Sequence, residues 1–211
     1  MTVYRTANLA FQLPGDGRLI EELANGADVL LLVECRDGGN RPVPVAEHLG
    51  KEWRVMQDTS SGERAGSVIA VRRGAVQVSW TRMLLASRPG VGVQGRYLRV
   101  AQIRDLRGLR RVGVLHNPLR PTGRQDDAVR SAQGWVRRAR RAGVPWVLAG
   151  DFNMAHEQMR DWLGALFSAG LPGDPMGIVW GRGWGIGERA PVPSHRRYAG
   201  SDHAVLTWRT R

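Results

Sequence analysis

Residues 146–154 read WVLAGDFNM, a short apolar run followed at once by a carboxylate and an amide. The apolar residues 147–149 predict a buried strand that stops at Gly150. Asp151 and Asn153 come next, two residues apart, so in extended chain their side chains leave the same face. Such a pair suits a hard cation and a phosphate, but it also suits an ordinary turn, because Gly, Asp and Asn all favour turns.

The composition bounds the class of protein. The chain has 211 residues, of which 42% are hydrophobic, so we expect residues 1–211 to form a single domain with a real core. The longest apolar run, Val29–Val33, is too short to span a bilayer, and the first residues lack a secretory pattern, so no stable membrane insertion is expected. The one cysteine, Cys35, excludes an internal disulfide and favours a cytoplasmic setting. We expect Cys35 to be a small buried hydrophobe rather than a nucleophile.

The net charge of +12 and a pI near 11.4 favour polyanionic partners, with nucleic acid first and anionic lipid second. Lys51 is the only lysine, and the other basic residues are arginine. A GC-rich coding genome would give the same bias without selection for binding. The charge therefore supports a nucleic-acid partner without establishing one.

Apolar patterns predict strands that alternate with helices. The expected strands, besides the one that leads into Asp151, are 3–9, 28–34, 53–57, 67–72, 75–83, 97–103, 111–115, 178–180 and 203–208. Shorter helices are expected at 17–26, 45–50 and 155–169, the last with Met159, Trp162, Leu163 and Leu166 directed inward. This order predicts an α/β sandwich of two sheets with helices packed on the outer faces.

The longest predicted helix precedes the Asp151 strand. Thr122 and Gln125 have capping-box spacing, and Gly143 and Pro145 end the helix. Its apolar stripe consists of Ala128, Ala132, Trp135, Val136 and Ala139. The opposite face is rich in arginine, and we interpret it as a solvated surface.

Polar residues follow several of the predicted strands at the point where each strand ends. They are Asn8, Glu34, His116, Asp151 with Asn153, and Asp202 with His203, which precede the last strand. Side chains at strand ends converge on one edge of a sandwich from distant parts of the sequence. Oxygen and imidazole donors gathered in this way predict a hydrolytic metal site.

The order of these motifs resembles the endonuclease/exonuclease/phosphatase superfamily. The motifs are Asn8, LLVE ending at Glu34, LH ending at His116, GDFN from Gly150 and GSDH ending at His203, spread over residues 3–208. The superfamily includes pancreatic-type deoxyribonuclease, abasic-site endonucleases, inositol phosphatases and neutral sphingomyelinases. The resemblance implies a deoxyribonuclease-like fold and a metal-dependent phosphoesterase.

The resemblance also implies roles for individual residues. Glu34 would be the main ligand of Mg²⁺ or Mn²⁺, helped by Asn8 and Asp202, because hard divalent ions take carboxylate oxygens and keep several waters. The alternative for Asn8 is that it satisfies backbone groups beside the first strand.

The catalytic groups implied by the resemblance are Asp151, Asn153, His203 and His116. Asp151 would orient or deprotonate the attacking water, and Asn153 would hold that water or a phosphate oxygen. His203 would face the scissile phosphate, with His116 as a second donor to it or to the leaving oxygen. Such a site must neutralise the phosphodiester charge and position a water in line.

One position departs from the family pattern. Members usually carry an Ile-Asp pair on the strand before the last, and its Asp supports the catalytic His. Residues 176–180 read MGIVW here and contain no acid, which leaves Asp174 as the nearest substitute. His48 and His156 have no place in the pattern and are interpreted as surface residues, and His195 as a surface residue or substrate neighbour.

Three functions remain open. The first is a nuclease on DNA or RNA, supported by the charge, by the arginines within 104–111, 120–124 and 182–197, and by Trp180 and Trp184, which could stack on bases or simply pack in the core. The second is hydrolysis of another phosphoester, a phospholipid or a sugar phosphate, although no membrane-docking segment is evident. The third is a catalytically weak binding module, whose support is the missing acid near Ile178.

Overall fold

The computed structural model of the protein describes residues 1–9, 17–37, 39, 41–61, 64, 66–87, 96–117, 125–171, 173–182, 194–197 and 203–209. The strands are β1 (Val3–Asn8), β2 (Val29–Val33), β3 (Trp53–Met56), β4 (Val68–Arg72), β5 (Gln77–Ser87), β6 (Arg96–Asp105), β7 (Gly108–His116), β8 (Trp146–Asp151), β9 (Phe167–Gly170), β10 (Met176–Trp180), β11 (Ser194–Arg197) and β12 (Ala204–Arg209). The helices are α1 (Arg18–Ala24), α2 (Val45–Leu49), α3 (Gln125–Arg141) and α4 (His156–Leu163).

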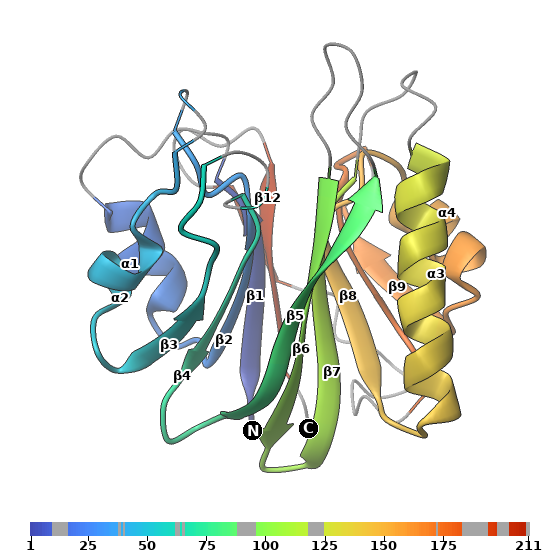
Figure 1. Ribbon diagram of the computed structural model, residues 1–211, viewed down its shortest axis with the longest axis horizontal. Coiled ribbons are helices and arrows are strands. Elements are labelled where there is room, and N and C mark those ends of the chain that lie inside the picture. Colours follow the sequence, from blue (N-terminus) through green and yellow to red (C-terminus); the bar gives the residue numbers. More distant parts are fainter. Residues whose placement is uncertain are drawn as a thin grey trace.

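The strands form two six-stranded sheets that face each other (Figure 1). The first sheet has the order β11-β12-β1-β2-β4-β3, and the second has the order β5-β6-β7-β8-β10-β9. Helices α1 and α2 lie outside the first sheet, and α3 and α4 lie outside the second. The two-sheet α/β sandwich with outer helices that the sequence predicts is therefore confirmed.

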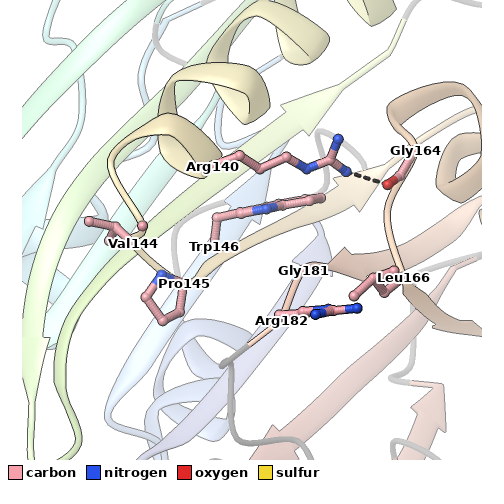
Figure 2. A pocket seen from close by; sticks show the side chains of 9 residues that line it. Arg140, Val144, Pro145, Trp146, Gly164, Leu166, Gly181 and Arg182 are labelled. Atoms are coloured by element: carbon pink, nitrogen blue, oxygen red, sulfur yellow. Dashed lines mark hydrogen bonds between the residues drawn. The ribbon is translucent and has the colours of Figure 1, made fainter.

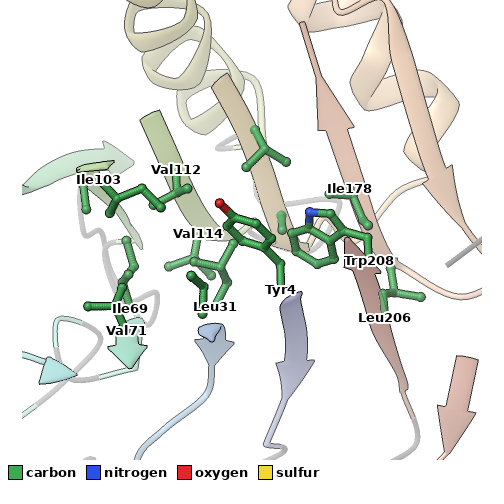
Figure 3. Close-up of a cluster of buried hydrophobic side chains, with 14 of the residues drawn as sticks. Tyr4, Leu31, Ile69, Val71, Ile103, Val112, Val114, Ile178, Leu206 and Trp208 are labelled. Atoms are coloured by element: carbon green, nitrogen blue, oxygen red, sulfur yellow. The ribbon is translucent and has the colours of Figure 1, made fainter. Parts of the chain in front are cut away.

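The central core lies between the two sheets (Figure 3). Leu31 and Ile69 from the first sheet belong to the same buried cluster as Ile103 and Val114 from the second. Burying each such side chain contributes about 1.5–3 kcal/mol, so this cluster is a main source of the free energy that joins the sheets.

A buried polar link also joins the sheets. The Tyr4 hydroxyl of β1 donates to Asp105 Oδ2 of β6 at 3.0 Å, and Arg110 Nε lies 3.0 Å from the same oxygen. Burial, the negative charge of Asp105 and this hydrogen bond keep the Tyr4 pKa well above its ordinary value. Because all three groups have partners, their burial leaves no uncompensated charge.

The outer layers follow the predicted amphipathic pattern. The apolar stripe of α3, from Ala128 to Ala139, packs on the second sheet, while Arg130, Arg137, Arg138 and Arg141 on its other face are exposed. Cys35 is fully buried, as its sequence context predicts. The capping box proposed for Thr122 lies outside the described residues.

The helix predicted at 155–169 is wrong at its C-terminal end. Gly164 has φ +59°, a left-handed conformation that ends α4 at Leu163. The following residues form β9, which pairs with β10, so Leu166 is 49% exposed rather than directed inward. The apolar residues keep a helical spacing beyond Gly164, which is why the sequence predicts a longer helix. In the structure, residues 167–170 instead pair with β10 as a strand.

Two features proposed for nucleic-acid contact are also corrected. Trp180 is 2% exposed and stacks on Phe167 in the core, so it does not present a face to a base. Arg110 is buried against Asp105, so the basic segment 104–111 is not a continuous exposed patch. Trp184 and residues 120–124 lie outside the described residues. No helix in the described ranges is long and apolar enough to cross a membrane.

Candidate active site

The strand directions bring the predicted site residues to one edge of the sandwich. β1 and β2 are parallel, and so are β7 and β8, with Asn8 opposite Val33 and His116 opposite Asp151. The carboxyl ends of both parallel pairs therefore meet at the edge where α/β proteins commonly place ligands. The strands β6, β10 and β12 are antiparallel to their neighbours and begin at this same edge.

Asp151 lies at the centre of the site. Its Oδ2 accepts a hydrogen bond from Asn8 Nδ2 at 2.9 Å and lies 3.6 Å from His203 Nε2 and 3.9 Å from His116 Nε2. Burial raises the pKa of Asp151, although the Asn153 backbone N–H, His203 and Asn8 act to lower it. A carboxylate with a raised pKa is a stronger base than an exposed one.

The loop after β8 is fixed by a short hydrogen-bond network. The Asn153 backbone N–H donates to Asp151 Oδ1 at 2.9 Å, and Asn153 Nδ2 donates to the Asn117 carbonyl at 2.6 Å. Asn117 Nδ2 in turn donates to the Phe152 carbonyl at 3.0 Å. Asn153 adopts φ +48°, a conformation that asparagine tolerates better than most residues. Part of the Asn153 amide is therefore used to hold the Asp151 loop.

Glu34 follows β2 and is buried next to Asp151. Its side chain is 12% exposed, and its Oε1 lies 3.5 Å from His116 Nε2. Burial and the negative charge of Asp151 raise its pKa from 4.5 to about 7, against the opposing effects of Arg36, Arg96 and His203. Glu34 also has φ +57°, a strained backbone conformation for a residue with a side chain, as is found at functional sites.

His116 ends β7 and is neutral in this environment. Burial lowers its pKa well below 6.5, and the positive charges of Arg96 and Arg36 lower it further. Arg96 Nη1 lies 3.4 Å from His116 Nδ1. Because a guanidinium only donates, Nδ1 must accept, which leaves the imidazole proton on Nε2, the atom that faces Glu34 and Asp151.

His203 precedes β12 and lies between two carboxylates. Its Nε2 is 3.6 Å from Asp151 Oδ2, and its Nδ1 is 3.8 Å from Asp174 Oδ1. Asp174 is buried, and the same Oδ1 accepts the Met176 backbone N–H at 2.9 Å. Asp174, which the sequence offers as the nearest substitute for the acid of the family pattern, therefore lies next to His203 and comes from the loop before β10.

The donor set at this edge fits a hard divalent cation. Glu34 supplies a carboxylate and Asn8 an amide, while Asp202 lies outside the described residues. The part of the chain that the structure describes has no cluster of three or more His, Cys, Asp or Glu side chains with metal-ligand geometry. One or two carboxylates with several waters is the usual coordination of Mg²⁺, so a closed protein cage is not required.

A cavity of about 330 Å³ adjoins the site. Asn153 and Asp174 belong to both, and the cavity is otherwise lined mainly by Met154, His156 and Leu171. The His156 side chain is 11% exposed and pairs with Glu157 at 3.1 Å, so its interpretation as a surface residue is wrong. This volume is at the lower end of the range for small-ligand sites.

The residues singled out in the sequence that meet at this edge are Asn8, Glu34, His116, Asp151, Asn153, Asp174 and His203. Sequence reasoning missed Arg36, Arg96 and Asn117. Arg36 stands two residues after Glu34, and Asn117 directly follows His116, so a wider search around each motif would have found both. Arg96 carries no local motif, because it reaches the site only through the antiparallel pairing of β6 with β7. The His195 side chain lies outside the described residues.

Comparisons with known proteins bear on the family and the fold. The sequence profile described as "Endonuclease/Exonuclease/phosphatase family" matches residues 6–206. A search of curated protein sequences finds no significant match.

Solved structures with the same fold cover nearly the whole chain. D. rerio TDP2, humanized by 14 mutations, is 14% identical with a TM-score of 0.68, over 98% of this chain and 97% of that one. A mannosyl-6-phosphatase from Bacteroides thetaiotaomicron is 14% identical with a TM-score of 0.71, over 98% of both chains. The human Nocturnin catalytic domain with bound sulfate is 13% identical with a TM-score of 0.66, over 98% and 92%. At such identities the likeness establishes the fold alone.

Proposed function

Because the chain belongs to the endonuclease/exonuclease/phosphatase family and is therefore a phosphoester hydrolase, we propose that it is a divalent-metal-dependent nuclease. It cleaves phosphodiester bonds of DNA or RNA by in-line attack of an activated water. The observation that carries this proposal is the meeting of Asn8, His116 and His203 around one oxygen of Asp151. Residues 1–211 act as a single catalytic domain in this proposal.

Asp151 is the group that orients and deprotonates the attacking water. Its raised pKa supports this role, because a base is most effective when its pKa approaches the working pH. The hydrogen bonds from Asn8 and Asn153 hold the carboxylate in one orientation. Preorganisation of this kind reduces the entropy lost on reaching the transition state.

The two histidines act on the phosphate. His203 faces the scissile phosphate, and Asp174, 3.8 Å from its Nδ1, holds the orientation of the ring. His116 is neutral and donates from Nε2 to a phosphate oxygen or to the leaving oxygen. Donors aimed at the oxygens where negative charge accumulates lower the barrier.

Glu34 and Asn8, with Asp202, would hold Mg²⁺ or Mn²⁺, as family members generally use divalent metal ions. The bound cation would supply positive charge to the phosphate oxygens. The burial of the Glu34 carboxylate supports this assignment. An ionised Glu34 next to Asp151 costs free energy unless a bound cation compensates its charge.

Three observations support nucleic acid as the substrate. Arg36 and Arg96 lie close enough to the site to lower the pKa of both Glu34 and His116, and the whole chain carries a net charge of +12. Guanidinium groups beside the reacting phosphate suit a polyanion. One structural neighbour, D. rerio TDP2, was solved in complex with a single-strand DNA product. The cytoplasmic setting remains a prediction.

The second candidate is hydrolysis of a small phosphoester, such as a sugar phosphate. The cavity of about 330 Å³ beside Asn153 and Asp174 favours it, because it could enclose one small leaving group. The binding-module hypothesis has lost its main support, since Asp174 lies 3.8 Å from His203.

The test is cleavage of supercoiled plasmid with Mg²⁺, with Mn²⁺ and with EDTA. Glu34→Gln and Asp151→Asn are compared with Arg141→Gln, which changes an exposed residue of α3. We expect metal-dependent nicking by the wild type and Arg141→Gln, and none by the two site variants. Hydrolysis of 4-nitrophenyl phosphate without nicking would move the assignment to the small phosphoester. Inactivity on both substrates would refute the enzymatic proposal.

A further inference from the structure

A second cavity lies at the opposite end of β8 from Asp151. Its volume is about 480 Å³, and its principal walls are Arg140, Val144, Pro145, Trp146, Leu166 and Arg182. Trp146 is the first residue of β8 and Asp151 is the last. At a rise of about 3.3 Å per residue, the two sites are about 17 Å apart along the strand. The cavity is therefore separate from the candidate active site.

The lining of this cavity is positively charged. Among the described residues that line it are Arg140 and Arg182 but no aspartate or glutamate. In Figure 2 the two arginine side chains flank Trp146 on opposite sides of the view. Arg182 is exposed, and no acidic side chain in the described ranges pairs with it. A cavity with two cations and no acid attracts an anionic ligand.

Arg140 is held in place before any ligand arrives. Its Nη2 donates to the carbonyls of Leu163, at 3.2 Å, and Gly164, and its guanidinium lies 5.8 Å from the Trp146 ring centroid. Within the described residues these bonds use one of its three nitrogens, so Nε and Nη1 keep donor capacity. A fixed guanidinium loses less entropy on binding an anion than a mobile one.

The remaining walls are apolar. Val144 and Pro145 form one side, and Leu166, which is 49% exposed, forms the other. Trp146 also lines the cavity and is itself 2% exposed. The Gly181 backbone lies so close to Trp146 that a Cβ there would be 2.4 Å from the indole Nε1. Apolar walls with a few fixed polar groups, in a cavity of this size, are typical of small-ligand sites.

We propose that this cavity binds a small organic anion. Its carboxylate or phosphate contacts Arg140 and Arg182, and its apolar body packs against Val144, Pro145 and Leu166. The inference goes beyond the proposed nuclease function and does not depend on it. Guanidinium groups bind phosphate and carboxylate through the same hydrogen bonds, so an experiment must show which of the two groups the ligand carries.

The test is isothermal titration calorimetry in EDTA with three probes. Naphthalene-2-carboxylate and adenosine 5′-monophosphate present the two anionic groups, and naphthalene-2-carboxamide is a neutral control. We expect at least one anion to bind, and naphthalene-2-carboxamide to bind about tenfold more weakly than naphthalene-2-carboxylate if the carboxylate is accepted. The probe that binds shows whether the cavity accepts a carboxylate or a phosphate. Binding of neither anion would refute the proposal.

Variants locate the binding. Arg182→Gln is expected to weaken the anion about tenfold, since it removes one charged hydrogen-bond donor. Leu166→Trp is expected to abolish binding by filling the cavity, while Arg141→Gln leaves it unchanged. Arg96→Gln tests the active site as the alternative location. Unchanged affinity in Arg182→Gln, or loss of binding in Arg96→Gln, would overturn the assignment.

Discussion

The two ends of β8 differ in charge and in the way their residues are supplied. At the Asp151 end, carboxylates and imidazoles from several strands meet within 4 Å of one another. At the Trp146 end, two arginines line a cavity, and its described lining contains no acid. The parallel strands β7 and β8 both have their carboxyl ends at the Asp151 end, so the residues that end them lie there together. The Trp146 end is built from turns and helix ends.

The largest effect is expected from Asp151→Asn. The amide can still accept the Asn153 backbone N–H, but it cannot remove a proton from water. Loss of a general base should lower kcat about 10³-fold. Plasmid-nicking rates at saturating Mg²⁺ measure this change, with Arg141→Gln as the reference for an exposed charge. Retention of more than a tenth of the activity would place the base elsewhere and break the contrast between the two ends of the strand.

Glu34→Gln should stabilise the metal-free protein at alkaline pH. The folded-state pKa of Glu34 is about 7 and its ordinary value is 4.5, so folding favours the protonated form. Its stabilising contribution is present below pH 4.5 and is lost as pH rises through about 7. At about 1.4 kcal/mol per pKa unit, the variant should gain roughly 3 kcal/mol at pH 8.

Urea unfolding in EDTA at pH 4 and pH 8 measures the difference. The variant and wild type should have similar stability at pH 4 and diverge at pH 8. Mg²⁺ should then stabilise the wild type alone, because the variant lacks the carboxylate. Equal stability at both pH values would show that Glu34 is solvated, and the acidic end of β8 would be less enclosed than its geometry indicates.

A pair of glycine variants tests the packing of the Trp146 end. Gly181→Ala places a Cβ 2.4 Å from Trp146 Nε1 and should cost about 2 kcal/mol by overpacking. Gly134→Ala is the matched control, since its Cβ would lie no closer than 3.6 Å to a flexible Arg138 side chain. This change in α3 should stabilise by about 0.5–1 kcal/mol. Thermal unfolding measures both, and a neutral Gly181→Ala would show that Trp146 is free to move.

The smallest effect is expected from Asp174→Asn. The amide oxygen can keep the Met176 hydrogen bond, but the negative charge 3.8 Å from His203 Nδ1 is lost. We expect kcat to fall about tenfold with little change in KM, because the charge acts through the histidine. Adding the substitution to His203→Gln should have no further effect. Additive losses would mean that Asp174 acts independently of His203.

The sequence predicted the architecture and the polar strand ends because both follow from local patterns. Glu34 and Asp151 each follow a continuous apolar run, and such runs mark buried strands. The strand directions then bring these residues together. This convergence was predictable because the motifs follow one another in the order found in a known family.

Residues that depend on strand pairing or burial were not predictable in this way. Arg96 reaches the site because β6 pairs antiparallel with β7, which places Arg96 near His116, twenty residues later in the chain. The residues next to Arg96 in the sequence contain no motif that identifies it as a site residue. The sequence leaves Trp180 free either to stack on a base or to pack in the core, because its exposure cannot be derived from composition, and the structure places it in the core. The sequence predicts too long a helix for α4, because Leu166 has helical spacing although Gly164 ends the helix.

The position of β1 between β12 and β2 has a consequence for synthesis. β1 is synthesised before the other described strands, whereas its neighbour β12, together with His203, follows most of them. In the proposed mechanism, no shorter nascent chain holds a complete set of catalytic groups. Under the proposed function, the nascent chain would therefore stay inactive until translation of the fold has finished.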